Sequence, residues 1–372
     1  MPSQPGTEGR LFRANPAFEL VVWDRLADDE RRLLGELAAR ESFYGILRPR
    51  AGSARALRAV DRDTALLLLT LQEAAPLPGF ARAGGDAAVA ELVTDGVLEV
   101  SDGDRYLTGG PGAALLLTGT ARESEHRLGR LSDEALRYGA ALRLRDPQSL
   151  AARLYAYNRI PLTPAWARRL PDAAGTLRFL DVNHSGGWQI GSSAGGSWIQ
   201  WSRRSQPRAG PLTHKLYVSP LPDALPDAFR RTLELLERSA VAQFKVGGDA
   251  AGVLRPDKLV IYFADAATLA GVADDLARAL AGVPAQGVPF TAPIDDDGLL
   301  SWGMDPPPEA RPLSWLPSES WRSWLVRELA SALLPAGDTP APVHPALERL
   351  RRRGVDVERW VPTSSVWRDP ER

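Results

Sequence analysis

The chain has 372 residues, with 45 Lys and Arg against 46 Asp and Glu, so its formal net charge is −1. At about 150 residues per domain, this length predicts two domains, with three also allowed. A hydrophobic fraction of 44% and a charged fraction of 24% are typical of globular proteins and exclude disorder as the main state. Because the net charge is close to zero, we expect no nucleic acid and no membrane as partners.

The chain contains no cysteine and four histidines. The lack of cysteine excludes disulfides, thiolate zinc sites, iron–sulfur clusters and cysteine nucleophiles. With so few histidines we expect no metal and no other cofactor. The longest apolar runs are far shorter than a membrane span, and the opening MPSQP has neither the basic stretch nor the apolar core of a signal peptide. We therefore expect a soluble, cytoplasmic protein.

Helical patterns dominate the first 150 residues. Apolar side chains recur at helical spacing over residues 26–40, and residues 61–71 form a compact apolar stretch behind Asp61, a favoured helix N-cap residue type. Residues 131–144 and 149–157 are also predicted to be helical, and the prolines that follow end the second of these helices.

Residues 86–109 predict a helix followed by a β-hairpin, with the tight turn at Ser101-Asp102-Gly103-Asp104. This order is typical of a winged-helix-like module, which binds DNA or peptides, and equally of elements that serve only for packing. The near-zero net charge and the lack of a basic helix argue against a winged-helix DNA-binding regulator.

After about residue 175 the periodicity changes to a mixture of strands and helices. Residues 176–182 alternate as in a strand, and residues 188–190 and 197–201 predict two short strands around a glycine-rich turn. That turn lacks the Lys-Ser/Thr ending of a phosphate-binding loop and leads into a strand, so we predict a hairpin. Further elements follow: strands at 214–219, 243–246 and 258–263, and helices at 227–242, 267–280 and 318–334. The mixture predicts an α+β fold, in which one strand pair could be parallel.

Three of these strands carry a lysine or a tyrosine among apolar neighbours. Because side chains alternate along a strand, Lys215 and Tyr217 share one face, and the apolar residues between them take the other. If the apolar face builds the core, then Lys245 converges with Lys215 and Tyr217 on the second face. The direction of Tyr262 stays open, because Tyr262 shares its face with Val260.

Two lysines held close together lower each other's pKa, which suits a general base near neutral pH. Arginine supplies forked donors that match a phosphate. The pattern therefore predicts an anion site on this sheet face, with an ordinary solvent-facing sheet surface as the alternative.

The same segments resemble the HopA-type type III effector family. The resemblance lies in KLYVS at 215–219, FKV at 244–246, RPDKLVIYF at 255–263, and the later blocks VPFT, GL, DP and SWR, and it covers about residues 175–335. Members also occur as lyase subunits in class V lanthipeptide and thioamitide pathways. Their fold is similar to that of phosphothreonine lyases and of the lyase domains of lanthipeptide synthetases.

The resemblance implies β-elimination of phosphate from phosphoserine or phosphothreonine in a ribosomal precursor peptide, phosphorylated by a separate Ser/Thr kinase. It implies no metal. Lys245 would be the general base, and Lys215 would contact the phosphate or the substrate carbonyl. Arg255 and Arg322 would hold the phosphate, and Tyr262 would orient the base or the phosphate.

One position departs from the family pattern. Phosphothreonine lyases carry a histidine where this chain has Tyr217, and that histidine protonates the leaving phosphate. Tyrosine, with an ordinary pKa of about 10, is a poorer acid. Either Tyr217 serves as the acid, or no acid is needed, or activity is lost; His214 would face the other side of the strand. A catalytically silent module that binds a phosphopeptide or a kinase is therefore the alternative function.

We predict residues 1–150 as a mostly helical, winged-helix-like N-terminal domain. Residues 151–372 are predicted as a mixed-sheet, phosphothreonine-lyase-like α+β domain with a Pro-rich C-terminal tail. The family resemblance does not explain the N-terminal domain, which we expect to capture the leader of the precursor or to dock the kinase.

Overall fold

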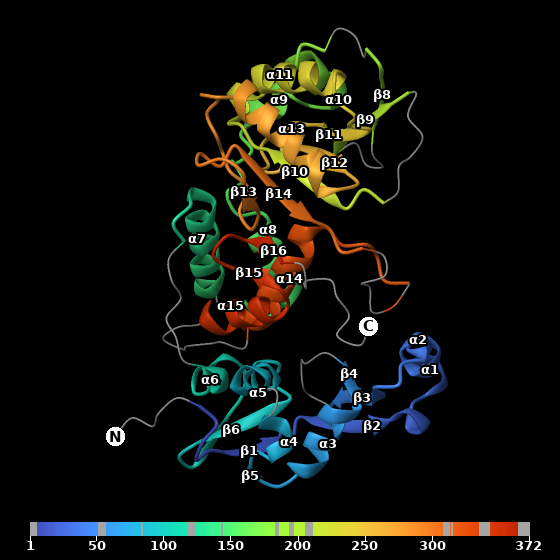
Figure 1. The fold of residues 1–372 in the computed structure, drawn as a ribbon, viewed down its shortest axis with the longest axis vertical. Coiled ribbons are helices and arrows are strands. Elements are labelled where there is room, and N and C mark those ends of the chain that lie inside the picture. The colour runs from blue at the N-terminus through green and yellow to red at the C-terminus, as the bar shows by residue number, and fades with distance from the viewer. Residues whose placement is uncertain are drawn as a thin grey trace.

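The computed structural model describes residues 6–50, 57–82, 85–117, 124–142, 144–182, 186–192, 197–204, 211–307, 313, 315–334 and 343–363. Within them the chain is α+β, as predicted. Figure 1 shows two sheet-containing parts, one built from the N-terminal residues and one from the middle of the chain, with a group of helices between them.

The N-terminal part contains two small antiparallel sheets with the strand orders β5-β1-β6-β7 and β2-β3-β4. Its strands are β1 (Leu11–Ala14), β2 (Phe18–Val22), β3 (Phe43–Pro49), β4 (Arg58–Asp61), β5 (Ala75–Pro76), β6 (Leu98–Asp102) and β7 (Arg105–Leu107). Its helices are η1 (Trp23–Arg25), α1 (Asp28–Leu33), α2 (Gly35–Ala38), α3 (Arg62–Thr70), α4 (Gly79–Arg82), α5 (Gly85–Thr94) and α6 (Gly109–Ala114). The two sheets and α3 share one buried apolar cluster that includes Phe12, Leu47 and Leu68.

Several N-terminal predictions are confirmed at the level of single elements. Asp61 caps α3, accepting a 2.6 Å hydrogen bond from the backbone N–H of Thr64. The predicted helix and hairpin correspond to α5 and to β6 paired with β7. The winged-helix classification of this segment remains a prediction. The continuous helix expected over residues 26–40 is two short helices, α1 and α2, that meet at Leu34.

The larger sheet has seven strands in the order β13-β14-β10-β12-β11-β9-β8. They are β8 (Trp188–Ser192), β9 (Trp198–Arg203), β10 (His214–Val218), β11 (Gln243–Gly247), β12 (Leu259–Phe263), β13 (Ala292–Pro293) and β14 (Leu300–Met304). Every strand pair recorded in this sheet is antiparallel, so the parallel pair considered from the sequence does not occur among the described strands. The hairpin of β8 and β9 is as predicted; residues 193–196 of its turn lie outside the described residues.

Helices cover one face of this sheet. They are α9 (Pro164–Arg169), α10 (Ala173–Phe179), η2 (Pro222–Ala224), α11 (Leu225–Glu237), α12 (Ala250–Val253) and α13 (Ala266–Ala279). Figure 1 shows α11 and α13 packed against the strands, and their buried side chains join Leu216, Val218 and Phe244 in the main core. The opposite face of the central strands carries the candidate site.

The strand predicted over residues 176–182 is wrong, because residues 176–179 belong to α10 and residues 180–182 follow it outside any strand. The Asp172 carboxylate accepts a 2.7 Å hydrogen bond from the backbone N–H of Gly175 and caps the helix. The apolar residues of such a short helix can imitate alternation, so the local pattern did not separate the two structures.

The remaining helices form a bundle between the two sheet-containing parts (Figure 1). They are α7 (Arg127–Ala141), α8 (Pro147–Tyr155), α14 (Trp321–Leu333) and α15 (Val343–Arg352), followed by the hairpin of β15 (Val355–Asp356) and β16 (Val361–Pro362). Their buried side chains form a separate core around Leu325 and Trp360. The division into domains at residues 150/151 remains a prediction. None of the helices in the described part of the chain is long and apolar enough to cross a membrane.

Candidate functional site

The strand register brings the predicted lysines and tyrosines together on one face. Lys215 pairs with Tyr262 across β10 and β12, Tyr217 pairs with Val260, and Lys245 of β11 also pairs with Val260. Directly paired residues of antiparallel strands point to the same face. The convergence expected from alternation is therefore present, and Tyr262, whose direction the sequence left open, joins it.

Lys245 lies among aromatic rings. Its Nζ is 4.1 Å from the ring centroid of Trp198 and 5.6 Å from that of Tyr262. Burial, followed by the positive charge of Lys215, lowers the pKa of Lys245 to about 8. A substantial fraction of this amine is therefore neutral at physiological pH, and a neutral amine can accept a proton.

Lys215 is held by Asp305, with which it forms an ion pair. Its Nζ also lies 5.5 Å from the ring centroid of Tyr262. Asp305 follows β14 and accepts a 2.8 Å hydrogen bond from the backbone N–H of Trp321, the first residue of α14. One carboxylate thus fixes both the lysine and the start of the helix that carries Arg322. Asp305 was not among the candidate residues expected from the sequence.

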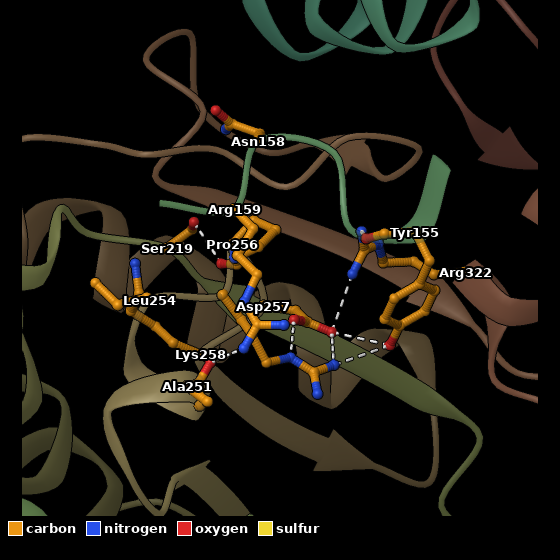
Figure 2. Close-up of polar contacts among 12 residues, drawn as sticks. Tyr155, Asn158, Arg159, Ser219, Ala251, Leu254, Pro256, Asp257, Lys258 and Arg322 are labelled. Carbon is orange, nitrogen blue, oxygen red and sulfur yellow. Dashed lines mark hydrogen bonds and ion pairs between the residues drawn. The ribbon is translucent and has the colours of Figure 1, made fainter. Parts of the chain in front are cut away.

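A second cluster is centred on Asp257 (Figure 2). Arg255 donates two hydrogen bonds to its carboxylate, each 2.9 Å long, and Nη1 of Arg322 lies 3.0 Å from Oδ2. The hydroxyl of Tyr155 donates to Oδ2 at 3.0 Å and accepts from Nη2 of Arg255 at 3.2 Å. Burial raises the pKa of Asp257, but the charges of Arg322 and Arg255 outweigh it and hold this pKa well below its usual range. The carboxylate stays ionised.

The two arginines differ in how much of the guanidinium is still available. Arg322 is 1% exposed; its Nη2 donates to the carbonyl of Tyr155 at 2.9 Å and its Nε to the carbonyl of Pro289 at 3.2 Å, whereas its Nη1 lies 3.0 Å from Oδ2 of Asp257 without forming a hydrogen bond. The Arg255 side chain is 24% exposed, and its Nη1 has no acceptor among the described residues. Arg255 can therefore bind an additional anion without losing a partner.

The tyrosines of the site are poor acids. Tyr217 is 3% exposed, and burial raises its pKa well above the ordinary value; burial also raises the pKa of Tyr262 and of Tyr155. These phenols stay protonated and can donate hydrogen bonds. His214 lies on the other face, as predicted, and burial lowers its pKa.

A buried lysine adjoins the Asp257 cluster and was missed in the sequence. Lys258 is fully buried; its Nζ donates to the carbonyl of Pro220 at 2.6 Å and to the side-chain oxygen of Gln286. Gln286 in turn donates to the carbonyl of Asn158 at 2.6 Å. Burial lowers the pKa of Lys258 to about 7. Figure 2 shows Lys258 pointing away from Arg322 and Tyr155, so we regard it as a support for the loops beneath the site.

The missed residues differ in how the sequence could have revealed them. Asp257 stands between Arg255 and Lys258 in the RPDK run, and an acidic residue beside two cations is a signal for an ion pair. Tyr155 comes from α8, about a hundred residues earlier, and nothing in its local sequence points to Arg255. Among the described residues, no group of three or more His, Cys, Asp or Glu side chains is arranged to hold a metal ion.

No protein-family model matches the chain, and a search of curated proteins found no match. Among solved structures, the effector protein from Pseudomonas syringae pv. tomato strain DC3000 aligns with a TM-score of 0.43 and 14% identity, over 63% of this chain and 98% of that chain. The phosphothreonine lyase OspF from Shigella flexneri aligns with a TM-score of 0.29 and 16% identity, over 45% and 90%. The Salmonella plasmid virulence C protein gives 0.30 and 19%, over 55% and 98%. These structural neighbours thus include effector proteins and a phosphothreonine lyase.

Proposed function

We propose that this sheet face catalyses β-elimination of phosphate from phosphoserine or phosphothreonine in a peptide. The observation that carries the proposal is Lys245: a half-buried amine with a pKa of about 8, beside a second lysine and an arginine with a free donor. This combination supplies a base and an anion site at the same place.

In the proposed reaction the neutral amine of Lys245 takes the proton from the substrate Cα. The electron pair left on Cα forms the Cα–Cβ double bond, and the Cβ–O bond breaks with its electrons going to the leaving phosphate. The products are dehydroalanine or dehydrobutyrine, free phosphate and protonated Lys245. Lys215 contacts the phosphate or the substrate carbonyl, where a positive charge favours loss of the Cα proton.

Arg255 is the main phosphate ligand in this proposal, because Nη1 remains available while Asp257 holds the rest of the guanidinium in place. Tyr262 contributes a hydroxyl on the same face. Because Arg322 is almost fully buried, we assign it to phosphate binding indirectly, through Asp257 and Tyr155, which it holds in place. With Lys245 neutral as the base, the three remaining cations Lys215, Arg255 and Arg322 still outnumber the two carboxylates Asp257 and Asp305 among the described residues of the site, which suits a negatively charged phosphate.

In this proposal, cationic side chains stabilise the charge of the leaving phosphate, so that little help from a general acid is needed. Tyr217 is buried and its pKa is raised, so proton donation from its hydroxyl is unfavourable near pH 7. A phosphate that leaves as a dianion between Arg255 and Lys215 needs less protonation. Tyr217 then acts as a hydrogen-bond donor.

The resemblance of the sequence blocks in residues 175–335 supports a finer proposal about the substrate. We infer that the peptide is a ribosomally made precursor in the cytoplasm, phosphorylated by a separate Ser/Thr kinase, as in the lanthipeptide lyase subunits that these blocks resemble.

Mass spectrometry after incubation with a phosphothreonine peptide tests the activity. Elimination gives a product that is lighter than the substrate by one phosphoric acid. Hydrolysis gives a product that is heavier than the elimination product by one water. The Lys245→Ala variant should lose about 100-fold or more in rate, the usual contribution of a general base, while it still binds the peptide. Hydrolysis, or full turnover by Lys245→Ala, would refute the proposed mechanism.

A binding module without catalysis is the second candidate function. The burial of Tyr217 and its departure from the family's histidine favour it. Saturable binding of the phosphopeptide with no change in mass, at any pH between 7 and 9, would support this function instead of the lyase.

A further inference from the structure

Strand β2 lies at an open edge of the N-terminal three-stranded sheet. The sheet order is β2-β3-β4, so among the described strands β2 pairs only with β3. Edge strands in soluble proteins are usually protected by charges, by proline or by bulges. The five residues of β2, FELVV, contain one charge and no proline. This edge is therefore well suited to accept another strand.

The pairing register shows which backbone groups of β2 point outward. The N–H of Arg50 donates to the carbonyl of Ala17, and the pairs further along β2 are Glu19 with Arg48 and Val21 with Ile46. Hydrogen-bonded and non-hydrogen-bonded pairs alternate in antiparallel strands. The alternate residues Leu20 and Val22 consequently direct their backbone groups away from β3.

Three of these outward groups are open to a partner. They are the N–H and the carbonyl of Leu20 and the N–H of Val22, none of which is hydrogen-bonded to another described residue. The carbonyl of Val22 belongs to the N-cap of η1 and accepts from that turn.

A groove of about 550 Å³ is lined by residues of β2, of the neighbouring strand β3 and of α3. The apolar lining residues include Phe18, Leu20 and Val22 of β2, Leu47 of β3 and Leu68 of α3. Such a groove offers apolar contacts to alternate side chains of an extended segment, next to the backbone donors and acceptor of the strand edge.

Two arginines at the groove favour an acidic partner. Arg25 and Arg50 line it and are exposed, and neither guanidinium forms an ion pair with another described residue. Glu19 is the one acidic side chain in the lining and is paired across the strands with Arg48. The local charge is therefore positive.

We propose that the β2 groove binds an extended, apolar and acidic segment of the peptide substrate, outside its phosphorylated residue, by adding it as a strand to β2. The identity of the occupant rests on the proposed function, because a peptide lyase must hold a substrate that is longer than its phosphorylated residue. The groove and the candidate site lie in separate parts of the molecule (Figure 1), so the bound segment adds affinity without contacting the reacting atoms.

Fluorescence anisotropy with the full chain tests strand addition directly. The probes are unphosphorylated, labelled peptides of about nine residues, longer than β2, in which Leu, Val and Ile alternate with Asp and Glu. Val22→Pro removes the outward N–H at a position whose φ of −70° already suits proline. We expect it to weaken binding about two- to tenfold, the effect of one lost hydrogen bond. Val22→Ala keeps the N–H and should weaken binding less.

Charge is tested with the double variant Arg25→Glu/Arg50→Glu, matched by Arg32→Glu on the exposed surface of α1. The double variant should lose affinity for the acidic probes and prefer probes with Lys in place of Asp and Glu, while Arg32→Glu behaves as wild type. No saturable binding of any acidic probe, or equal losses for Val22→Pro and Val22→Ala, overturns strand addition. A dimer that Val22→Pro converts to monomer identifies a second copy as the occupant and also overturns it.

Kinetics separate this proposal from the function on which it rests. A phosphopeptide extended by the alternating segment should have a lower KM than the same phosphopeptide without it, and Val22→Pro should reduce this difference with kcat unchanged. If elimination occurs but the alternating segment does not change KM, the proposal for the groove is overturned and the lyase function stands. Normal binding of the unphosphorylated probes without elimination overturns the lyase function alone.

Discussion

At the scale of single residues, the environment of Lys245 decides what the site can do. An exposed lysine has a pKa of about 10.4 and is almost entirely protonated at neutral pH. Burial against Trp198 and Tyr262 and the nearby charge of Lys215 bring the pKa of Lys245 to about 8. The same amine on the helix-covered face would meet only apolar side chains, without a second cation to attract a phosphate.

The pH dependence of elimination follows from this pKa. Lys245 must be neutral to accept a proton, so kcat/KM should rise with pH and level off above about 8. Lys215→Gln removes a positive charge that lowers the pKa of Lys245, and should move the midpoint to higher pH. Initial rates between pH 6 and 10 measure both effects. A rate that falls as pH rises through 8 would contradict Lys245 as the base.

Tyr217 gives a second test at the residue scale. Because burial raises its pKa, its hydroxyl contributes little as an acid, and Tyr217→Phe should lower kcat by less than about tenfold. Single-turnover rates with a phosphothreonine peptide measure this change. A loss of a hundredfold or more, with peptide binding unchanged, would show that the phenol does protonate the leaving phosphate.

At the scale of elements, Asp257 joins three parts of the chain that are distant in sequence. It lies just before β12 and binds Arg322 of α14, Tyr155 at the end of α8 and its own neighbour Arg255. The Asp257 carboxylate neutralises positive charge of Arg255 and Arg322. Without it, these two arginines would carry unpaired charge in a buried environment. The orientation of Arg255 toward the site therefore depends on packing between the helical bundle and the sheet.

Asp257→Asn should destabilise the protein by about 3–5 kcal/mol, the usual cost of breaking a buried ion pair. It should also weaken phosphopeptide binding, because Arg255 loses its anchor. Urea unfolding and peptide titration measure the two effects. Asp223→Asn is the matched control, since the Asp223–Arg169 pair is exposed and its loss should change stability by less than about 1 kcal/mol. Equal effects of the two variants would contradict the anchoring role.

At the scale of the whole molecule, buried ion pairs connect the N-terminal part to the C-terminal helix. Arg349 of α15 binds Asp95, which follows α5, and also Glu328 of α14 at 3.0 Å. Asp95 is additionally paired with Arg58 at 2.9 Å. Because both carboxylates are largely buried, Arg349 helps to position the N-terminal part relative to the bundle, together with Arg352, which pairs with Glu91 of α5.

Arg349→Met should lower the free energy of unfolding by about 3 kcal/mol, because it leaves Asp95 and Glu328 with fewer partners in a buried place. We expect the N-terminal part to unfold at a lower temperature than the rest, so that calorimetry shows two transitions. Arg351→Met, which removes the more exposed Arg351–Glu348 pair within α15, should leave a single transition. A single, unshifted transition for Arg349→Met would refute the connection.

The sequence predicted part of the site for a local reason. Alternation along a strand is a property of the backbone, so KLYVS alone placed Lys215 with Tyr217, and FKV placed Lys245 opposite Phe244. The sequence-based prediction was wrong where an apolar pattern was too short to distinguish a strand from a helix. At α10, the capping residue Asp172 favours the helix. The sequence also left the direction of Tyr262 open, because Tyr262 shares its face with the apolar Val260.

By itself, then, the sequence determined the α+β class, the strands that carry the cations and the side of each strand on which they lie, because these depend on residues within a few positions of one another. Only the tertiary structure decided that Tyr262 joins the lysines, that Asp305 holds Lys215, and that Tyr155 and Arg322 surround Asp257. Those contacts form when strands pair and helices pack across the sheet. The free energy that favours this arrangement comes from the whole buried core, whose residues are distant from one another in the sequence.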